Sequence, residues 1–167
     1  MKRTFLQNMN HLLLSQKHLH RTFSKAAFEH IEKAIKESES RHSGQVLFIV
    51  EAALPTHLLL QQQSPRDRAL DLFSKFKVWD TQDNNGVLIY LLLADKDIEI
   101  IADRGIHNRS GAAFWQSVCQ EMEVLLKHGR FEEGILLGIK RIDHILTQEF
   151  PISRPVLNEI PDQIIII

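Results

Sequence analysis

The chain has 167 residues, a length that fits one globular domain with its own hydrophobic core. Its 44% hydrophobic and 25% charged residues are ordinary for a folded protein and argue against extended disorder. With a formal net charge of -1, the chain lacks the excess of basic residues that binds nucleic acids and anionic membranes, so we expect no nucleic-acid partner.

Residues 1–22 are predicted to form an N-terminal helix or arm rather than an export signal. Their apolar residues have loosely helical spacing, are interrupted by Gln, Asn and His, and precede no small-residue cleavage site. The single cysteine, Cys119, fits a reducing compartment. No stretch approaches the roughly eighteen uncharged apolar residues of a transmembrane segment. We therefore expect a soluble, cytoplasmic protein without a transmembrane segment.

Residues 23–150 are predicted to form one α/β domain. Ser24 is placed to cap a helix that runs to about Ser38, with Phe23 and Phe28 as a hydrophobic staple. The sequence "QVLFIVE" that follows is apolar on both faces, as a central strand covered by helices would be. After a Gln-rich loop, "SPRD" from Ser64 contains a capping residue, a proline and an acid, which predicts a second helix.

The second half of this domain begins with a predicted β-hairpin. "VLIYLLL" and "IEIIA" are two strands joined by the four residues "ADKD". Two helices follow, one from Ser110 to about Lys127 with Gly129 as its C-cap, and one from Phe131 to about Phe150. The order helix, strand, helix, strand, strand, helix, helix predicts a three-layer α/β sandwich, a twisted mixed β-sheet with helices on both faces.

Polar residues are predicted to gather at one edge of this sheet. Parallel pairing of the first two strands places their starts together, and the hairpin returns the end of the third strand to the same edge. The predicted metal ligands there are Asp80, Asp83, Asn84, Asn85 and Asp103, and the other polar residues of this edge are Glu39, His42 and Arg104.

Carboxylate and amide oxygens are the ligands that Ca²⁺ and Mg²⁺ prefer, so the predicted cofactor is one of these ions. The segment is not an EF-hand loop, because Thr81 occupies the first ligand position and Leu92 stands where a bidentate Glu belongs. The alternative is that these Asp and Asn residues only form turns. A metal here could also assist phosphate hydrolysis with Arg104 as the phosphate ligand, but the residues alone favour a surface salt bridge for Arg104.

No catalytic nucleophile motif and no motif for an organic cofactor occurs in the chain. The nine histidines include no zinc-protease motif.

Residues 151–167 form a C-terminal tail that ends in four isoleucines. Such a segment has high β-propensity and no charge, so it would aggregate if it were left exposed. It is predicted to add an edge strand to the sheet. The alternatives are self-association through the tail, and docking of the tail and the N-terminal helix onto another, membrane-associated protein.

Three segments together resemble the TPM domain, a family found in bacteria and chloroplasts. They are Gly44 to Val50 after a helix, "DNNGVLIYLLLADKDIEIIADRGI", and "GRFEEGILLGI" from Gly129 to Ile139. The resemblance implies a twisted sheet with helix pairs on both faces and divalent-cation binding at loops on one sheet edge. A plant member of the thylakoid lumen is associated with acid phosphatase activity and photosystem II repair.

Position by position, the resemblance carries over Asn85, Gly86 and Asp103, whereas Asp80 and Asp83 lie in a segment that varies more. The signal peptide and transmembrane tail of many members are not seen. The sequence thus predicts a small soluble bacterial TPM-like domain, an accessory or interaction module with a divalent-cation site at the acidic sheet edge. The alternative is a metal-assisted phosphatase of low activity.

Overall fold

A computed structural model describes residues 11, 16–153 and 157–167. Most of the predicted N-terminal arm lies outside these residues. Its described part is His11, which accepts a hydrogen bond from the Leu54 N–H, and helix α2 (Gln16–Thr22), which places Leu19 in the core. None of the helices in the described ranges is long and apolar enough to cross a membrane.

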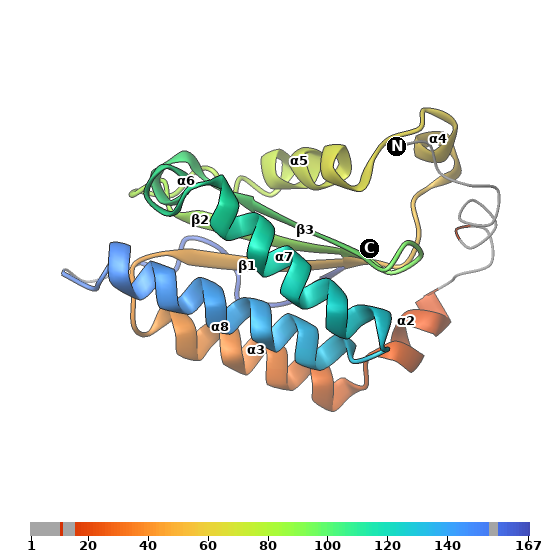
Figure 1. The fold of residues 1–167 in the computed structure, drawn as a ribbon, viewed down its shortest axis with the longest axis horizontal. Coiled ribbons are helices and arrows are strands. Elements are labelled where there is room, and N and C mark those ends of the chain that lie inside the picture. Colours follow the sequence, from red (N-terminus) through yellow and green to blue (C-terminus); the bar gives the residue numbers. More distant parts are fainter. Residues whose placement is uncertain (1–10, 12–15, 154–156) are drawn as a thin grey trace.

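The structure has a four-stranded sheet in the order β3-β2-β1-β4 (Figure 1). The first strand, β1, pairs in parallel with β2 and with β4, whereas β2 and β3 form the antiparallel hairpin. The strands are β1 (Gln45–Glu51), β2 (Gly86–Leu92), β3 (Asp97–Ala102) and β4 (Ile165–Ile166). The remaining helices are α3 (Lys25–Glu39), α4 (Thr56–Leu60), α5 (Pro65–Lys75), α6 (Arg104–Ser110), α7 (Ala112–Lys127) and α8 (Phe131–Glu149).

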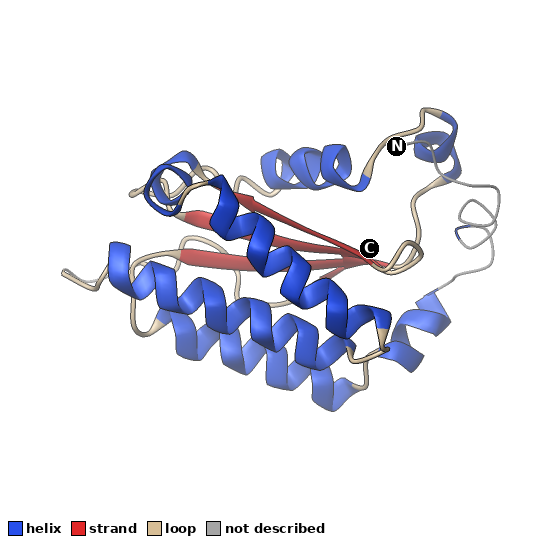
Figure 2. Ribbon diagram, in the orientation of Figure 1, coloured by secondary structure: helices blue, strands red, loops and turns tan. Residues whose placement is uncertain are grey.

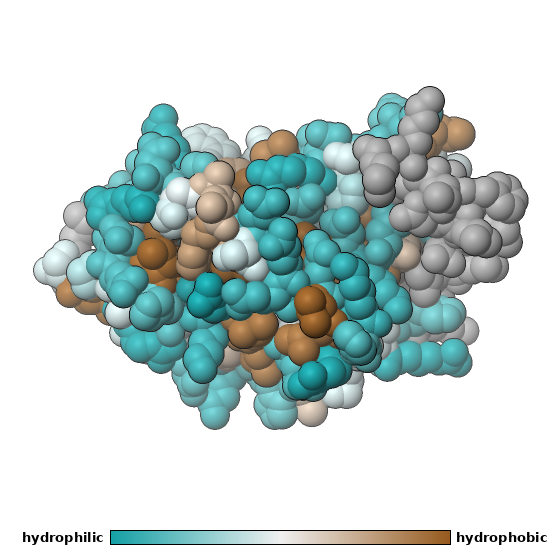
Figure 3. All heavy atoms as spheres, viewed as in Figure 1, coloured by the Kyte–Doolittle hydropathy of each residue, from teal (hydrophilic) through white to brown (hydrophobic). Residues whose placement is uncertain are grey.

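Helices cover both faces of the sheet, which confirms the predicted three-layer fold (Figure 2). Every residue of β1 and β2 is buried, and successive side chains alternate between two cores. The larger core lies between the sheet and α3, α7 and α8, and the smaller one lies under α5. The outward surface of α3, α7 and α8 is mostly hydrophilic, with small separate apolar patches (Figure 3).

Local capping signals in the sequence act as predicted. The Ser24 hydroxyl accepts a hydrogen bond from the Ala27 N–H at 3.0 Å, and the rings of Phe23 and Phe28 stack with centroids 5.2 Å apart. Ser64 and Asp67 form a complete capping box at the start of α5. The C-cap residue of α7 is His128, and the predicted Gly129, with φ of 75°, follows it at the position where glycine commonly ends a helix.

Two short helices were not expected from the sequence. Residues of α4 were assigned to a loop, because its N-cap is Pro55 and makes no side-chain hydrogen bond. Helix α6 begins six residues before the predicted helix start at Ser110, because the Asp103 carboxylate caps the Arg104 N–H at 2.7 Å. Gly111, with φ of 78°, then ends α6 and separates it from α7.

The C-terminal tail lies against the rest of the chain as the edge strand of the sheet. Ile165 and Ile166 pair with β1, and the Ile167 N–H donates to the Val50 carbonyl at 3.0 Å. Upstream, the Gln45 Oε1 atom accepts hydrogen bonds from the backbone N–H groups of Glu159 and Ile160 at 2.8 and 3.0 Å.

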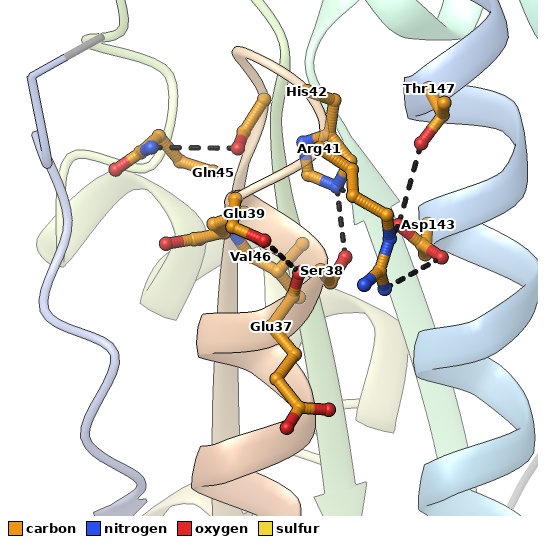
Figure 4. A network of polar contacts seen from close by, with 11 residues as sticks. Glu37, Ser38, Glu39, Arg41, His42, Gln45, Val46, Asp143 and Thr147 are labelled. Carbon is orange, nitrogen blue, oxygen red and sulfur yellow. Dashed lines mark hydrogen bonds and ion pairs between the residues drawn. The ribbon is translucent and has the colours of Figure 1, made fainter.

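A pair of carboxyl groups also joins the tail to α3. Glu39 accepts a hydrogen bond from the Val46 N–H at 2.7 Å (Figure 4). Burial, together with a hydrogen bond and charge repulsion from Asp162 of the tail, raises the pKa of Glu39 to about 8. Glu39 is therefore mostly protonated at neutral pH, and its carboxyl O–H can donate a hydrogen bond to Asp162.

The Gly86→Ala substitution should strongly destabilise the fold. A Cβ atom at Gly86 would lie 2.0 Å from the Val78 carbonyl oxygen, so backbone must move to admit it. We expect a loss of about 3 kcal/mol in the free energy of unfolding, measured by urea denaturation. The control is Gly129→Ala, where no atom lies within 4 Å of the added Cβ and only the positive φ opposes the change, at about 1 kcal/mol. Equal losses in both variants would contradict the steric argument.

The pKa of Glu39 predicts a pH-dependent stability. Because the pKa is raised on folding, the stabilising contribution is complete below the unfolded value of 4.5 and is lost as the pH rises through about 8. The Glu39→Gln variant keeps an acceptor for Val46 and a donor for Asp162 without titrating. Its free energy of unfolding should therefore exceed that of the wild type at pH 9, by an amount on the order of a few kcal/mol.

The matched control is Glu37→Gln, because Glu37 is an exposed carboxylate on the same helix and forms only an i,i+4 pair with Lys33. Urea unfolding between pH 5 and pH 9 measures the effect. A Glu39→Gln variant with the pH dependence of the wild type would show that Glu39 does not titrate as described.

Candidate functional site

The strand register brings the predicted polar edge together. Gln45 at the start of β1 lies opposite Gly86 at the start of β2. The Asp103 N–H, just past β3, donates to the Gly86 carbonyl at 2.9 Å. The segments before β1 and β2 and after β3 thus meet at one edge of the sheet, as the sequence predicts.

Four residues from these segments form the centre of the edge, which we call the acidic edge: Ser43, Asp83, Asn85 and Asp103. The Ser43 hydroxyl donates to Asp83 Oδ2 at 3.2 Å and accepts a hydrogen bond from Asn85 Nδ2 at 3.2 Å. Ser43 therefore connects two of the predicted ligands. It was not predicted as a site residue, and its position two residues before the first strand is the signal that could have identified it.

Two buried oxygen atoms of the acidic edge have no hydrogen-bond partner among the described residues. Asn85 is 1% exposed, and its Oδ1 atom is unpartnered because the amide nitrogen faces Ser43. Asp103 is 8% exposed, and its Oδ1 caps α6 while its Oδ2 is unpartnered. Both atoms are acceptors, so the group that would satisfy them is a hydrogen-bond donor or a cation.

The loop before β2 is held tightly against the start of α6. Asn84 adopts a positive φ of 52°, and its carbonyl oxygen accepts the Ile106 N–H at 3.3 Å. A Cβ atom at Gly105 would lie 2.4 Å from that oxygen, so only glycine allows this approach. The Asn84 side chain accepts a hydrogen bond from Arg104 Nε at 3.3 Å. Asn84 therefore helps to shape the edge, and its side-chain oxygen bonds Arg104.

Asp80 lies apart from the acidic edge. It is exposed in the turn after α5, where its N–H donates to the Lys77 carbonyl at 2.8 Å. In the part of the chain that the structure describes, its carboxylate makes no hydrogen bond or ion pair. Unlike Asp83 and Asn85, which meet at Ser43, Asp80 has no side-chain contact with another predicted ligand among the described residues.

His42 belongs to a separate, buried network beside α8 (Figure 4). Its Nε2 lies 2.8 Å from Ser38 Oγ and 3.7 Å from Asp143 Oδ1, and Asp143 also binds Arg41 through two hydrogen bonds. Burial lowers the pKa of His42 to about 4, so the ring is neutral at pH 7. A catalytic triad needs its Ser and Asp on opposite ring nitrogens, whereas Ser38 and Asp143 both approach Nε2. The network fits a structural role.

Glu39, the other predicted polar residue on this side, bonds Val46 and the tail, as described above. The eight predicted residues thus divide: Asp83, Asn85 and Asp103 line the acidic edge, Asn84 and Arg104 bond each other beside it, and Asp80, Glu39 and His42 lie elsewhere.

The acidic edge suits a hard cation in its atom types. Two carboxylates and one amide oxygen are ligands of the kind that Ca²⁺ and Mg²⁺ accept. Within the described residues there is no cluster of three or more His, Cys, Asp or Glu side chains that could hold a metal. A cation here would depend on amide, hydroxyl or water oxygens for the rest of its coordination.

The solved structures that are similar to the chain include the following two. The first is the NMR structure of the BA42 protein from the psychrophilic bacterium Bizionia argentinensis, with 28% identity and a TM-score of 0.75 over 86% of this chain and 94% of that one. The second is the N-terminal domain of a protein from P. gingivalis, with 16% identity and a TM-score of 0.61 over 80% of this chain and 83% of that one, which shows a shared fold.

No curated protein matches the chain. The sequence model of the TPM domain matches residues 18–145, which span α2 to α8 and include the whole acidic edge. The chain therefore belongs to the TPM domain family.

Proposed function

We propose that this domain is an accessory binding module whose acidic edge binds a divalent cation, Ca²⁺ or Mg²⁺, through Asp83, Asn85 and Asp103. The observation that supports it is the pair of buried, unpartnered acceptors, Asn85 Oδ1 and Asp103 Oδ2. A buried acceptor without a partner costs about 1–3 kcal/mol, and a bound cation would satisfy both atoms.

The surrounding contacts prepare these oxygens for a cation. Because the Asn85 amide nitrogen donates to Ser43, the amide oxygen is the atom that remains for a ligand. Ser43 also positions the Asp83 carboxylate, and the Arg104 N–H fixes one oxygen of Asp103. With two carboxylates, the site has fewer charged ligands than a high-affinity calcium site, so we expect a dissociation constant of about 1 mM.

The same geometry supports the proposed accessory role. A bound cation would tie the loops before β1 and β2 to the start of α6, and so stiffen one end of the domain. A protein partner that contacts this end would then bind a pre-ordered surface, which lowers the entropy cost of association.

The second candidate, a metal-assisted phosphatase of low activity, would use the same cation to activate water. It additionally requires a coordination position that remains open to the substrate. A hydrolysis assay with the cation present therefore distinguishes the two functions, and it belongs in the same experiment.

The test is calorimetric titration with Ca²⁺ and with Mg²⁺, accompanied by thermal melting. At about 10 mM cation and a dissociation constant of about 1 mM, binding should stabilise the fold by about 1.4 kcal/mol and raise Tm by about 4 °C. Asp103→Asn should weaken binding at least tenfold, because it removes a charged ligand. The matched control is Asp80→Asn, a change of the same charge in the exposed turn after α5, apart from the acidic edge.

The proposal is refuted if, at 10 mM, neither ion produces heat or shifts Tm. It is also refuted if Asp80→Asn and Asp103→Asn weaken cation binding equally. Cation-dependent hydrolysis of p-nitrophenyl phosphate that disappears in Asp103→Asn would identify the domain as the phosphatase. Binding without hydrolysis would support the binding module.

A further inference from the structure

We propose that the open edge of β3 is a docking site for an extended apolar peptide that ends in a free C-terminal carboxylate, with the carboxylate beside Arg104. This site is separate from the cation site and uses the groove along β3 between α5 and α7.

The backbone of β3 has a side that faces away from the sheet. In an antiparallel hairpin, hydrogen-bonded residue pairs alternate with pairs that are not hydrogen-bonded. The Asp103 N–H bonds the Gly86 carbonyl, which makes this a hydrogen-bonded pair and fixes the alternation along β3. The N–H and C=O groups of Ile98, Ile100 and Ala102 therefore point away from β2. Because β3 is the end strand of the sheet, they face the open edge. A row of such groups is the usual template for adding a further strand.

This edge is bordered by a groove of about 530 Å³, within the range of ligand sites. Arg66 and Leu70 of α5 line one side, and Trp115 and Cys119 of α7 line the other. Figure 1 shows α5 and α7 on either side of the sheet along β3. Both walls include apolar side chains, Leu70 on one side and Trp115 on the other, which apolar side chains of an added strand could contact.

Trp115 presents a hydrogen-bond donor to the groove. It is only 5% exposed, it lines the groove, and its indole Nε1 has no hydrogen-bond partner among the residues that the structure describes. A buried indole N–H usually finds an acceptor. A backbone carbonyl of an extended peptide in the groove would be such an acceptor.

In the middle of the edge, side chains of the same chain make only weak hydrogen bonds to the outward backbone groups of β3. Ile100 alone of the three outward residues has side-chain partners: its carbonyl lies 3.4 Å from Arg66 Nη1, and its N–H bonds the Cys119 thiol. Both are weak hydrogen bonds. Among the described residues, the outward groups of Ile98 and Ala102 have no partner, so both ends of the edge are available.

Charge identifies which end of a peptide would fit. At the Ala102 end the groove is lined by Arg104 and His107, and Arg104 makes no ion pair in the described part of the chain. At the other end the acids are already paired, Glu99 with Arg66 and Glu123 with Lys127. The only guanidinium of the groove that lacks a carboxylate is thus at the Ala102 end, and a planar carboxylate suits it.

The end of the groove favours a terminal carboxylate over an acidic side chain. Helix α6 begins at Arg104, directly after β3, and its residues His107 and Asn108 line this end. A peptide that continued past Ala102 would meet α6, whereas one that stops there fits. A C-terminal carboxylate at this position orients the peptide parallel to β3.

The experiment uses the full ¹⁵N-labelled chain without added divalent cation, and the probe peptide acetyl-Val-Thr-Val-Thr-Val with a free carboxylate. The chain has two tryptophans, so the indole signal of Trp115 can be followed against that of Trp79, which is 49% exposed outside the groove. Trp115→Phe assigns the signal. We expect the peptide to shift the Trp115 indole and the Ile98 and Ala102 amides, and to leave the Trp79 indole unchanged.

The carboxylate is tested in two ways. The same peptide with a C-terminal amide should bind about tenfold more weakly, and Arg104→Gln should weaken the acid peptide by about the same factor while leaving the amide peptide unaffected. Arg21→Gln, a change at an exposed arginine of α2, is the control and should have no effect.

No shift at millimolar peptide, shifts of Trp79 in place of Trp115, or equal affinities for the acid and amide peptides would each overturn the proposal. Because cation is omitted and Asp103 is unchanged, failure here is independent of the cation titration.

Discussion

The parallel pairing of β1 with β2, buried on both faces, is the constraint on which the other features of this domain depend. Parallel neighbours require a crossover, here through α4 and α5, and strands without a polar face require helices on both sides. The same pairing aligns the starts of both strands. The polar residues that precede β1 and β2 must therefore lie together, although about forty residues of sequence separate Ser43 from Asp83 and Asn85.

Buried polar side chains are fully hydrogen-bonded at one end of these strands and not at the other. At the carboxyl end, Glu51 is buried but fully paired: Arg68 donates two hydrogen bonds at 2.9 Å, and the Tyr90 hydroxyl donates one at 2.7 Å. At the amino end, Asn85 and Asp103 leave oxygens without partners. Ligands of open parallel sheets usually bind at the carboxyl ends of the strands. In this domain the Glu51 network at the carboxyl end is complete. The unsatisfied acceptors at the amino end therefore favour that end as the place where a ligand would bind.

Strands, the long helices and their caps could be predicted from the sequence because each depends on local patterns. Ser24, Ser64 and Gly129 act within a few residues of their own position, and apolar runs identify buried strands directly. The short helix α6 was not predicted, because its only sequence signal is one capping carboxylate, Asp103. The same residue was interpreted as a metal ligand.

The acidic edge could be predicted only in part, since its membership depends on side-chain directions. The sequence predicts Asp80, Glu39 and His42 at the same edge as Asp83, because all of them precede the start of a strand by a few residues. Their side chains differ: Glu39 bonds Val46, and His42 packs beside Ser38 and Asp143. Ser38 is only four residues before His42, but Asp143 cannot be connected with His42 without knowing how α8 lies against α3.

The two proposed sites meet at one peptide bond, between Asp103 and Arg104. A cation on Asp103 and a carboxylate on Arg104 would have opposite charges and would lie on adjacent residues. Each would lower the electrostatic cost of binding the other, and by linkage the two effects on binding must be equal. The Asp103 contact to the Arg104 N–H joins them further, because it fixes the start of α6, which closes the groove. A cation at the acidic edge would thus order the end of the groove that receives the peptide carboxylate.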